Sequence, residues 1–186
     1  MSEKESAILA ATLHLVSQHG FHGTSMSMIA KEAGVSAGII YHYFDNKDAL
    51  MAALYGKIKR DMSRAILADY HESDPLRDRF RRILLNSLHF FMHHPAETAY
   101  LEQFANSPYC TPSSEAAYKQ EFNLLEDLLQ HAIREGVIKD VPFEMIMTFT
   151  SSVVMDLAKK HISGALVLGD TLQDLAVQMC WDALRT

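Results

Sequence analysis

The side chains best suited to specific recognition lie in one short stretch of the chain. As a helix, this stretch presents a hydroxyl, a phenol and an imidazole outward, and such groups hydrogen-bond to DNA bases and phosphates. Two small residues let its backbone approach a major groove. The outward residues are Ser36, Ala37, Gly38, Tyr41 and His42. Lys47 falls in the first turn of the next predicted helix, where its ammonium joins free backbone N–H groups that can face a phosphate. The pattern predicts a face that binds double-stranded DNA.

Histidines near the middle of the chain form a second group with possible chemistry. His89 and His93 have the i, i+4 spacing that can bind a metal ion, and His94 stands beside them. Surface or pocket-lining histidines before a proline are the favoured interpretation, so no metal site is predicted. Cys110 could sense oxidants, although an idle thiol is the simpler interpretation. The sequence has no nucleophile elbow, phosphate loop or paired-carboxylate motif, so no cofactor and no enzyme activity are predicted.

Residues 26–44 have the spacing of a helix-turn-helix. Two helices that cross steeply need a small residue where they touch, and Ala30 supplies it. The tight turn that follows needs a backbone that accepts positive φ, and Gly34 supplies it. Apolar anchors close a small core with the helix before them, and these are Ile29, Val35 and Ile40. Together the positions predict a recognition helix over residues 36–44.

Helical periodicity runs through the rest of the sequence, and we find no convincing strand. Ser2 and Glu5 have capping-box spacing before the first helix. Prolines mark the starts of later helices, because proline tolerates the first helical turn but not the interior. We expect helices near residues 2–20, 24–34, 36–44, 46–70, 75–94, 95–106, 114–135, 142–164 and 170–186. The predicted fold class is all-α, with about nine helices: an N-terminal three-helix head and a C-terminal bundle.

Composition narrows the class of protein. The chain has 186 residues, of which 48% are apolar and 22% charged, as in a soluble globular protein and unlike a disordered chain or a rod. No apolar stretch reaches the ~18 residues of a membrane helix. The N-terminus has no signal-peptide pattern, and two cysteines give no disulfide framework. A cytoplasmic location is the simplest expectation.

The net charge of −6 is unevenly distributed along the chain. Residues 1–60 carry six Lys and Arg against five acids, whereas residues 61–186 carry eleven against eighteen. The protein therefore lacks the overall basic field that is typical of nucleic-acid-binding proteins. DNA binding would have to depend on a local surface near the N-terminus.

A set of residues in the first third of the chain matches a known pattern. These residues are Gly20-Phe21, Thr24-Ser25, Ile29-Ala30, Ala33-Gly34-Val35-Ser36, Gly38, Tyr41-His42-Tyr43-Phe44, Lys47 and Leu50. Over residues 3–60 the chain resembles the TetR family of bacterial repressors. The resemblance implies an all-helical dimer whose first three helices bind DNA and whose later helices enclose an effector pocket. The family's DNA-contact positions fall on Thr24, Ser36, Ala37, Gly38, Tyr41, His42 and Lys47, where Ala37 replaces a residue that is often polar or basic.

Several helices in the second half of the chain are apolar nearly all round, so they must be buried on two sides. An internal cavity and a second subunit are the expected partners. The expected effector-pocket residues, with plain core packing as the alternative, are Phe90, Phe91, Tyr100, Phe104, Phe122, Phe149 and Met155. Ten methionines favour an adaptable cavity. Together with the resemblance, the pattern assigns the dimer interface to the last two helices, through Val154, Leu157, His161, Leu172, Leu175 and Met179.

Two classes of function remain open. In the first, a ligand-responsive transcriptional repressor, residues 1–50 and the start of a connecting helix at 46–70 bind a palindromic operator. Residues 51–186 then bind a small, largely hydrophobic effector and form a homodimer. The second class is an all-helical small-molecule-binding protein or enzyme in which residues 1–50 are only structural. The helix-turn-helix spacing and the outward polar face favour the repressor.

Overall fold

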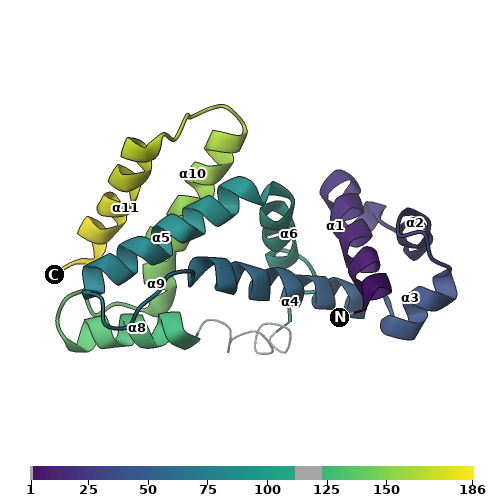
Figure 1. Ribbon diagram of the computed structural model, residues 1–186, viewed down its shortest axis with the longest axis horizontal. Helices are drawn as coiled ribbons and strands as arrows, with labels where there is room; N and C mark the ends of the chain where they lie inside the picture. Colours follow the sequence, from purple (N-terminus) through teal and green to yellow (C-terminus); the bar gives the residue numbers. More distant parts are fainter. Residues whose placement is uncertain (1, 112–122) are drawn as a thin grey trace. The chain divides into compact units, whose positions relative to one another are not determined.

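The computed structural model describes residues 2–111 and 123–186, and it places most of them in helices (Figure 1). The helices are α1 (Glu3–Gly23), α2 (Met26–Glu32), α3 (Ala37–Tyr43), α4 (Lys47–Ile66), α5 (Leu76–His93), α6 (Pro95–Ala105), α8 (Asn123–Arg134), α9 (Phe143–Met147), the π-helix η2 (Thr148–Ser152), α10 (Val153–Ile162) and α11 (Asp170–Leu184). With α9, η2 and α10 counted as one continuous helix, the described residues form nine helices and no strand. The predicted all-α fold is confirmed.

The helix starts follow local capping chemistry. The hydroxyl of Ser2 accepts a hydrogen bond from the Glu5 amide at 3.1 Å, and the Glu5 carboxylate accepts one from the Ser2 amide at 3.2 Å. These two bonds form the predicted capping box at the start of α1. At the start of α4, the side-chain oxygen of Asn46 accepts a hydrogen bond from the Ala49 amide at 2.8 Å. Short polar side chains therefore satisfy the first free amides of both helices.

The chain forms two compact units. The first contains residues 2–60 and 96–111, and the second contains residues 61–95 and 123–186. Most of α6 therefore belongs with α1, α2 and α3, although it comes much later in the sequence. The helix α4 begins in the first unit and ends in the second. These units do not coincide with the functional division proposed from the sequence at residue 50, because α6 packs with the N-terminal helices.

The core of the first unit joins a helix-turn-helix to a group of aromatic rings. α1, α2 and α3 contact one another, and their interior side chains, including Ile29 and Ile40, are fully buried. A second set of rings, which we call the aromatic cluster, consists of Phe21, Tyr55, Tyr100, Phe104 and Tyr109. Phe21 meets Tyr100 edge-on with ring centroids 5.1 Å apart, and Tyr55 stacks on Phe104 at 4.1 Å. The aromatic cluster thus holds α6 against α1 and α4.

The second unit is built around α5. This helix packs against α10 and α11, which lie beside it (Figure 1). Phe80 of α5 meets Trp181 of α11 edge-on at 5.1 Å, and both side chains are buried. An ion pair joins the same two helices, between Arg81 of α5 and Asp174 of α11 at 2.5 Å. No helix in the described ranges is long and apolar enough to cross a membrane.

A single glycine shapes the end of α1. Gly20 has φ 68° and ψ 177°, which interrupts the helical backbone and redirects the chain at Phe21. This backbone region is essentially restricted to glycine, because a Cβ atom there clashes with the backbone. The ring of Phe21 enters the aromatic cluster immediately after the break. The predicted helix stop at Gly20 is therefore seen as a break, after which one further turn reaches Gly23.

We expect Gly20→Ala to lower the free energy of unfolding by about 1–3 kcal/mol, because alanine must adopt the strained backbone of Gly20. Urea unfolding followed by circular dichroism measures this change. Gly38→Ala is the matched control, since Gly38 lies within α3 and an added Cβ meets nothing closer than the Ser36 hydroxyl at 3.9 Å. Equal stability of the two variants would contradict the role given to Gly20.

Candidate functional site

The recognition helix α3 presents one face to solvent and one face to the core. Ile40 is fully buried beneath it, and this fixes which side of the short helix points outward. The exposed residues on the outer side are Ser36, Ala37, Gly38, Tyr41 and His42. The side chain of Tyr41 is among the large apolar side chains that remain open to solvent, at 53% exposure. The structure therefore brings five of the seven predicted DNA-contact residues together on one accessible surface.

Both ends of α3 are held by the surrounding helices. Before α3, the Val35 amide donates to the Ala30 carbonyl at 3.0 Å, in the turn that Gly34 allows by taking φ 65°. After α3, Phe44 is buried and the Ser2 hydroxyl donates to the Tyr43 hydroxyl at 2.9 Å. The aromatic residues at this end thus pack the helix against the rest of the first unit. Ser36 makes no capping bond with its side chain, so its hydroxyl stays available to a ligand.

Two of the predicted contact residues point inward. Thr24 is 1% exposed, and its hydroxyl donates to the Gly20 carbonyl at 2.9 Å. This hydroxyl closes the broken end of α1, and the DNA contact that the resemblance gives to Thr24 stays a prediction. Lys47 is half-buried, and its ammonium donates to the Phe21 carbonyl at 2.6 Å. Lys47 thus fastens the end of α1 to the start of α4, and its remaining N–H donors are the ones that could meet a phosphate.

The predicted pocket residues are divided between the two units. Phe90 and Phe91 are buried in the second unit, where Met155 is half-buried and Phe149 is 45% exposed. Tyr100 and Phe104 lie in the aromatic cluster of the first unit, and the Tyr100 hydroxyl donates to the Met51 carbonyl at 2.8 Å. These two rings are core residues of that unit. The remaining predicted residue, Phe122, lies outside the described residues.

The predicted dimer residues fall on helices α10 and α11. Three of them expose large apolar side chains on α11: Leu172 at 42%, Leu175 at 51% and Met179 at 64%. Leu157 and His161 are half-buried on α10, and His161 accepts a hydrogen bond at Nδ1 from the Leu168 amide. Val154 is fully buried within its own chain, because α10 packs against α5. The contact of Val154 with a second subunit stays a prediction, and in the single chain its side chain is already part of the core.

The histidines and cysteines make ordinary contacts within the protein. His89 bonds through Nε2 to the Gln173 side chain, and His93 bonds through Nδ1 to the carbonyl of His89, each at 2.8 Å. Among the described residues, no group of three or more His, Cys, Asp or Glu side chains could hold a metal ion. Burial raises the pKa of the Cys180 thiol, which makes it a weak nucleophile at neutral pH. Cys110 is half-buried.

Comparison with known proteins gives matches along both parts of the chain. Residues 8–54 match the family described as bacterial regulatory proteins, tetR family, and residues 75–185 match the tetracyclin repressor-like, C-terminal domain. Over 179 residues the chain is 25% identical to an uncharacterized HTH-type transcriptional regulator of Haemophilus influenzae. This match covers 96% of this chain and 94% of that protein.

Two further relatives are similar over most of their length. The chain is 26% identical over 141 residues to the fatty acid metabolism regulator protein of Bacillus subtilis, covering 74% of this chain and 72% of that one. A crystal structure of a TetR family transcription regulator from Marinobacter aquaeolei VT8 superimposes with a TM-score of 0.93 at 30% identity. The match covers 98% of this chain and 95% of that chain.

We expect Lys47→Met to lower the free energy of unfolding by about 1.5–3 kcal/mol, because the Phe21 carbonyl loses a charged hydrogen-bond donor. Chemical unfolding in urea measures the change. Lys31→Met is the matched control: Lys31 is exposed on α2, and its loss should alter stability by no more than about 0.5 kcal/mol. If both variants unfold at the same urea concentration, Lys47 does not fasten the two helices.

Proposed function

This chain belongs to the TetR family of DNA-binding transcriptional regulators, and from that premise we propose that it is a repressor that a small hydrophobic effector releases from a palindromic operator. The family and the relatives are transcription regulators and not enzymes. The observation that carries the proposal is the exposed polar face of α3, held at both ends by buried residues. The alternative function, an all-helical small-molecule-binding protein or enzyme in which residues 1–50 are only structural, gives no reason for such a face.

The chemistry of α3 fits the major groove of DNA. Ala37 and Gly38 at its start have little or no side chain, so the backbone can approach the base edges closely. Tyr41 and His42 then extend a phenol and an imidazole from the next turn, and both are exposed. We assign Tyr41 to a phosphate and His42 to a base edge, because contacts of the first kind position a protein on DNA and contacts of the second kind specify sequence.

Exposed apolar side chains support a homodimer. On α11, Leu172, Leu175 and Met179 recur at spacings of three and four residues, and they share the outer side of the helix. Large apolar side chains gathered in this way usually mark an interaction surface. A second copy of the chain would cover this face of α11 with the same face of its own α11. Such a dimer carries two copies of α3, as a two-fold operator requires.

We place the effector among the helices of the second unit, against the buried rings of Phe90 and Phe91. A long-chain fatty acid is the first probe, since it is hydrophobic and a relative of this chain is a fatty acid metabolism regulator protein. The helix α4 runs without interruption from the first unit into the second, and it can transmit a change of position. The effector releases DNA only if it binds the DNA-free state more tightly than the DNA-bound state.

We expect His42→Ala to change which base is preferred at one operator position, by about 1–3 kcal/mol, because a base contact is lost. Tyr41→Phe should weaken binding to specific and random duplexes alike, because a phosphate contact carries no sequence information. Fluorescence anisotropy with duplexes from the region upstream of the gene measures both effects. The control is His93→Ala, at an exposed histidine of the second unit. Unchanged affinity and preference in both α3 variants would rule out the assigned face.

We expect the double substitution Leu175→Asp and Met179→Asp to convert the dimer to monomer, because two carboxylates would be buried without partners at the interface. Sedimentation velocity measures the oligomeric state at micromolar concentration. Gln130→Asp, at an exposed position of α8, adds the same kind of charge and should leave the dimer intact. A double variant that sediments like the wild type would place the interface elsewhere.

A further inference from the structure

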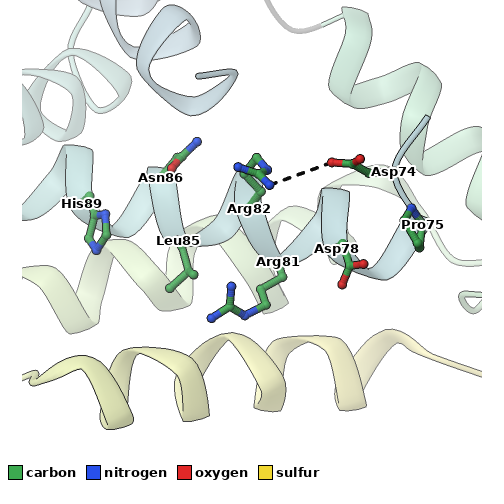
Figure 2. A pocket seen from close by; sticks show the side chains of 8 residues that line it. All are labelled: Asp74, Pro75, Asp78, Arg81, Arg82, Leu85, Asn86 and His89. Carbon is green, nitrogen blue, oxygen red and sulfur yellow. Dashed lines mark ion pairs between the residues drawn. The ribbon is translucent and has the colours of Figure 1, made fainter. Parts of the chain in front are cut away.

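A cleft along α5 and a cleft beside α6 differ in the charge of the side chains that line them. The cleft along α5, of ≈ 410 Å³, has two arginines in its lining, and both are already ion-paired: Arg82 with Asp74 (Figure 2) and Arg81 with Asp174. The second cleft, of ≈ 360 Å³, lies within the first unit and is lined from the ends of α1 and α6. The described residues that line it include no Asp, Glu, Lys or Arg. We call it the α1–α6 groove.

The broken end of α1 forms one side of the α1–α6 groove. Gly20 turns the chain here, and the next turn folds closely back on α1, because a Cβ atom on Gly23 would lie 3.0 Å from the Cβ atom of His19. His19 and His22 both line the groove, and both are exposed. Neither side chain bonds to another described residue. Two imidazoles, each with a nitrogen that can donate or accept, are therefore open to a ligand.

Two side-chain amides line the groove from α6 and the residues after it. Gln103 is half-buried, and its Oε1 lies 3.6 Å from the place that a Cβ atom on Gly20 would take. Its amide has no hydrogen-bond partner among the described residues. Asn106 donates from Nδ2 to the Glu102 carbonyl at 2.9 Å, which leaves its second N–H and its oxygen for a ligand. Each amide thus offers a donor beside an acceptor.

Two aromatic rings complete the lining. Phe21 is buried and Tyr109 is half-buried, and their ring centroids lie 5.3 Å apart with the planes tilted by 47°. Burial, and to a smaller degree the nearby carboxylate of Asp48, raises the pKa of the Tyr109 phenol, so this group stays neutral at physiological pH. The groove therefore combines an uncharged aromatic surface with uncharged hydrogen-bonding groups.

We propose that the α1–α6 groove binds an uncharged heteroaromatic base, of the class of free purines and their nucleosides. The ring of the base stacks on Tyr109, and its edge bonds to the amides of Gln103 and Asn106. Proteins recognise exposed bases in this way, by stacking on Tyr, Phe or His and by hydrogen bonds to the base edge. Asn and Gln amides suit this role because their adjacent donor and acceptor match those of adenine.

The lining selects this class over related ligands. A nucleotide gains little from its phosphate, because no lysine or arginine lines the groove to pair with it. A free sugar has no ring that can stack on Tyr109. The volume of ≈ 360 Å³ lies near the lower end of the range for small-molecule sites, about 300–1,000 Å³, and it suits one base with its sugar. No lining residue belongs to the predicted DNA, effector or dimer sets, so this site is separate from them.

Isothermal titration calorimetry on the full chain, without DNA, tests the proposal. Adenosine is the probe, D-ribose is the control that lacks the base, and AMP is the control that adds a phosphate. We expect saturable binding of adenosine at about millimolar concentration or below, at least about tenfold weaker binding of D-ribose, and no tighter binding of AMP. This measurement is independent of the proposed regulatory function, because it needs neither operator nor hydrophobic effector.

Variants of the amide and the ring locate the site. Gln103→Met removes the amide at nearly constant size, and Tyr109→Leu removes the aromatic ring, so each should weaken adenosine binding at least about tenfold. Tyr109→Phe keeps the ring and should bind like the wild type. Gln130→Met, at an exposed glutamine of α8 in the second unit, is the matched control for Gln103→Met and should also bind like the wild type. Circular dichroism verifies that each variant is folded.

Three results would overturn the proposal. The first is that adenosine does not bind. The second is that D-ribose binds as tightly as adenosine, or AMP at least about tenfold more tightly, since either would mean that the base is not the recognised group. The third is that Gln103→Met retains wild-type affinity for adenosine, and this exposed-side substitution remains informative even if Tyr109→Leu fails to fold.

Discussion

The packing of Phe21 after the backbone break at Gly20 is the contact on which the first unit depends. Its ring meets Tyr100 of α6 in the aromatic cluster, while its carbonyl accepts a hydrogen bond from Lys47 at the start of α4. One residue thus joins α1 to two helices that are distant in sequence. Because α3 is packed between the N-terminal helices and is followed directly by α4, the orientation of the recognition helix depends on this junction.

Electrostatics places a second constraint on the molecule. The chain as a whole is acidic, with a net charge of −6, which repels the DNA phosphates. DNA binding therefore depends on surfaces where local attraction exceeds this repulsion. In the first unit, the exposed face of α3 contributes neutral hydrogen-bonding groups. The Lys47 ammonium already donates one hydrogen bond to the Phe21 carbonyl, and only its remaining N–H donors are left for a phosphate. Operator binding would therefore rely on fit in the major groove more than on a dense array of cations, and this favours specific over random DNA.

Local patterns predicted much of this fold, whereas contacts between distant residues were not predictable. The capping box at Ser2 and the turn at Gly34 depend on neighbours within a few residues, and both occur where the sequence places them. Thr24 was assigned to DNA because its position matches a contact position of the family, and nothing local shows that its hydroxyl reaches the Gly20 carbonyl. Val154 lies in a helix that is apolar on two sides, and periodicity cannot tell which side meets the chain's own core. The contact of α6 with Phe21 likewise depends on tertiary packing.

The central claim is that a two-fold dimer of this chain reads DNA through the exposed face of α3. Nuclease footprinting of the wild-type protein on the DNA upstream of its gene tests it most directly. The account predicts two protected half-sites related by two-fold symmetry, with centres ~34–36 Å apart along the duplex or at a multiple of that spacing. A single unpaired half-site, or uniform protection without preference for any sequence, would contradict it.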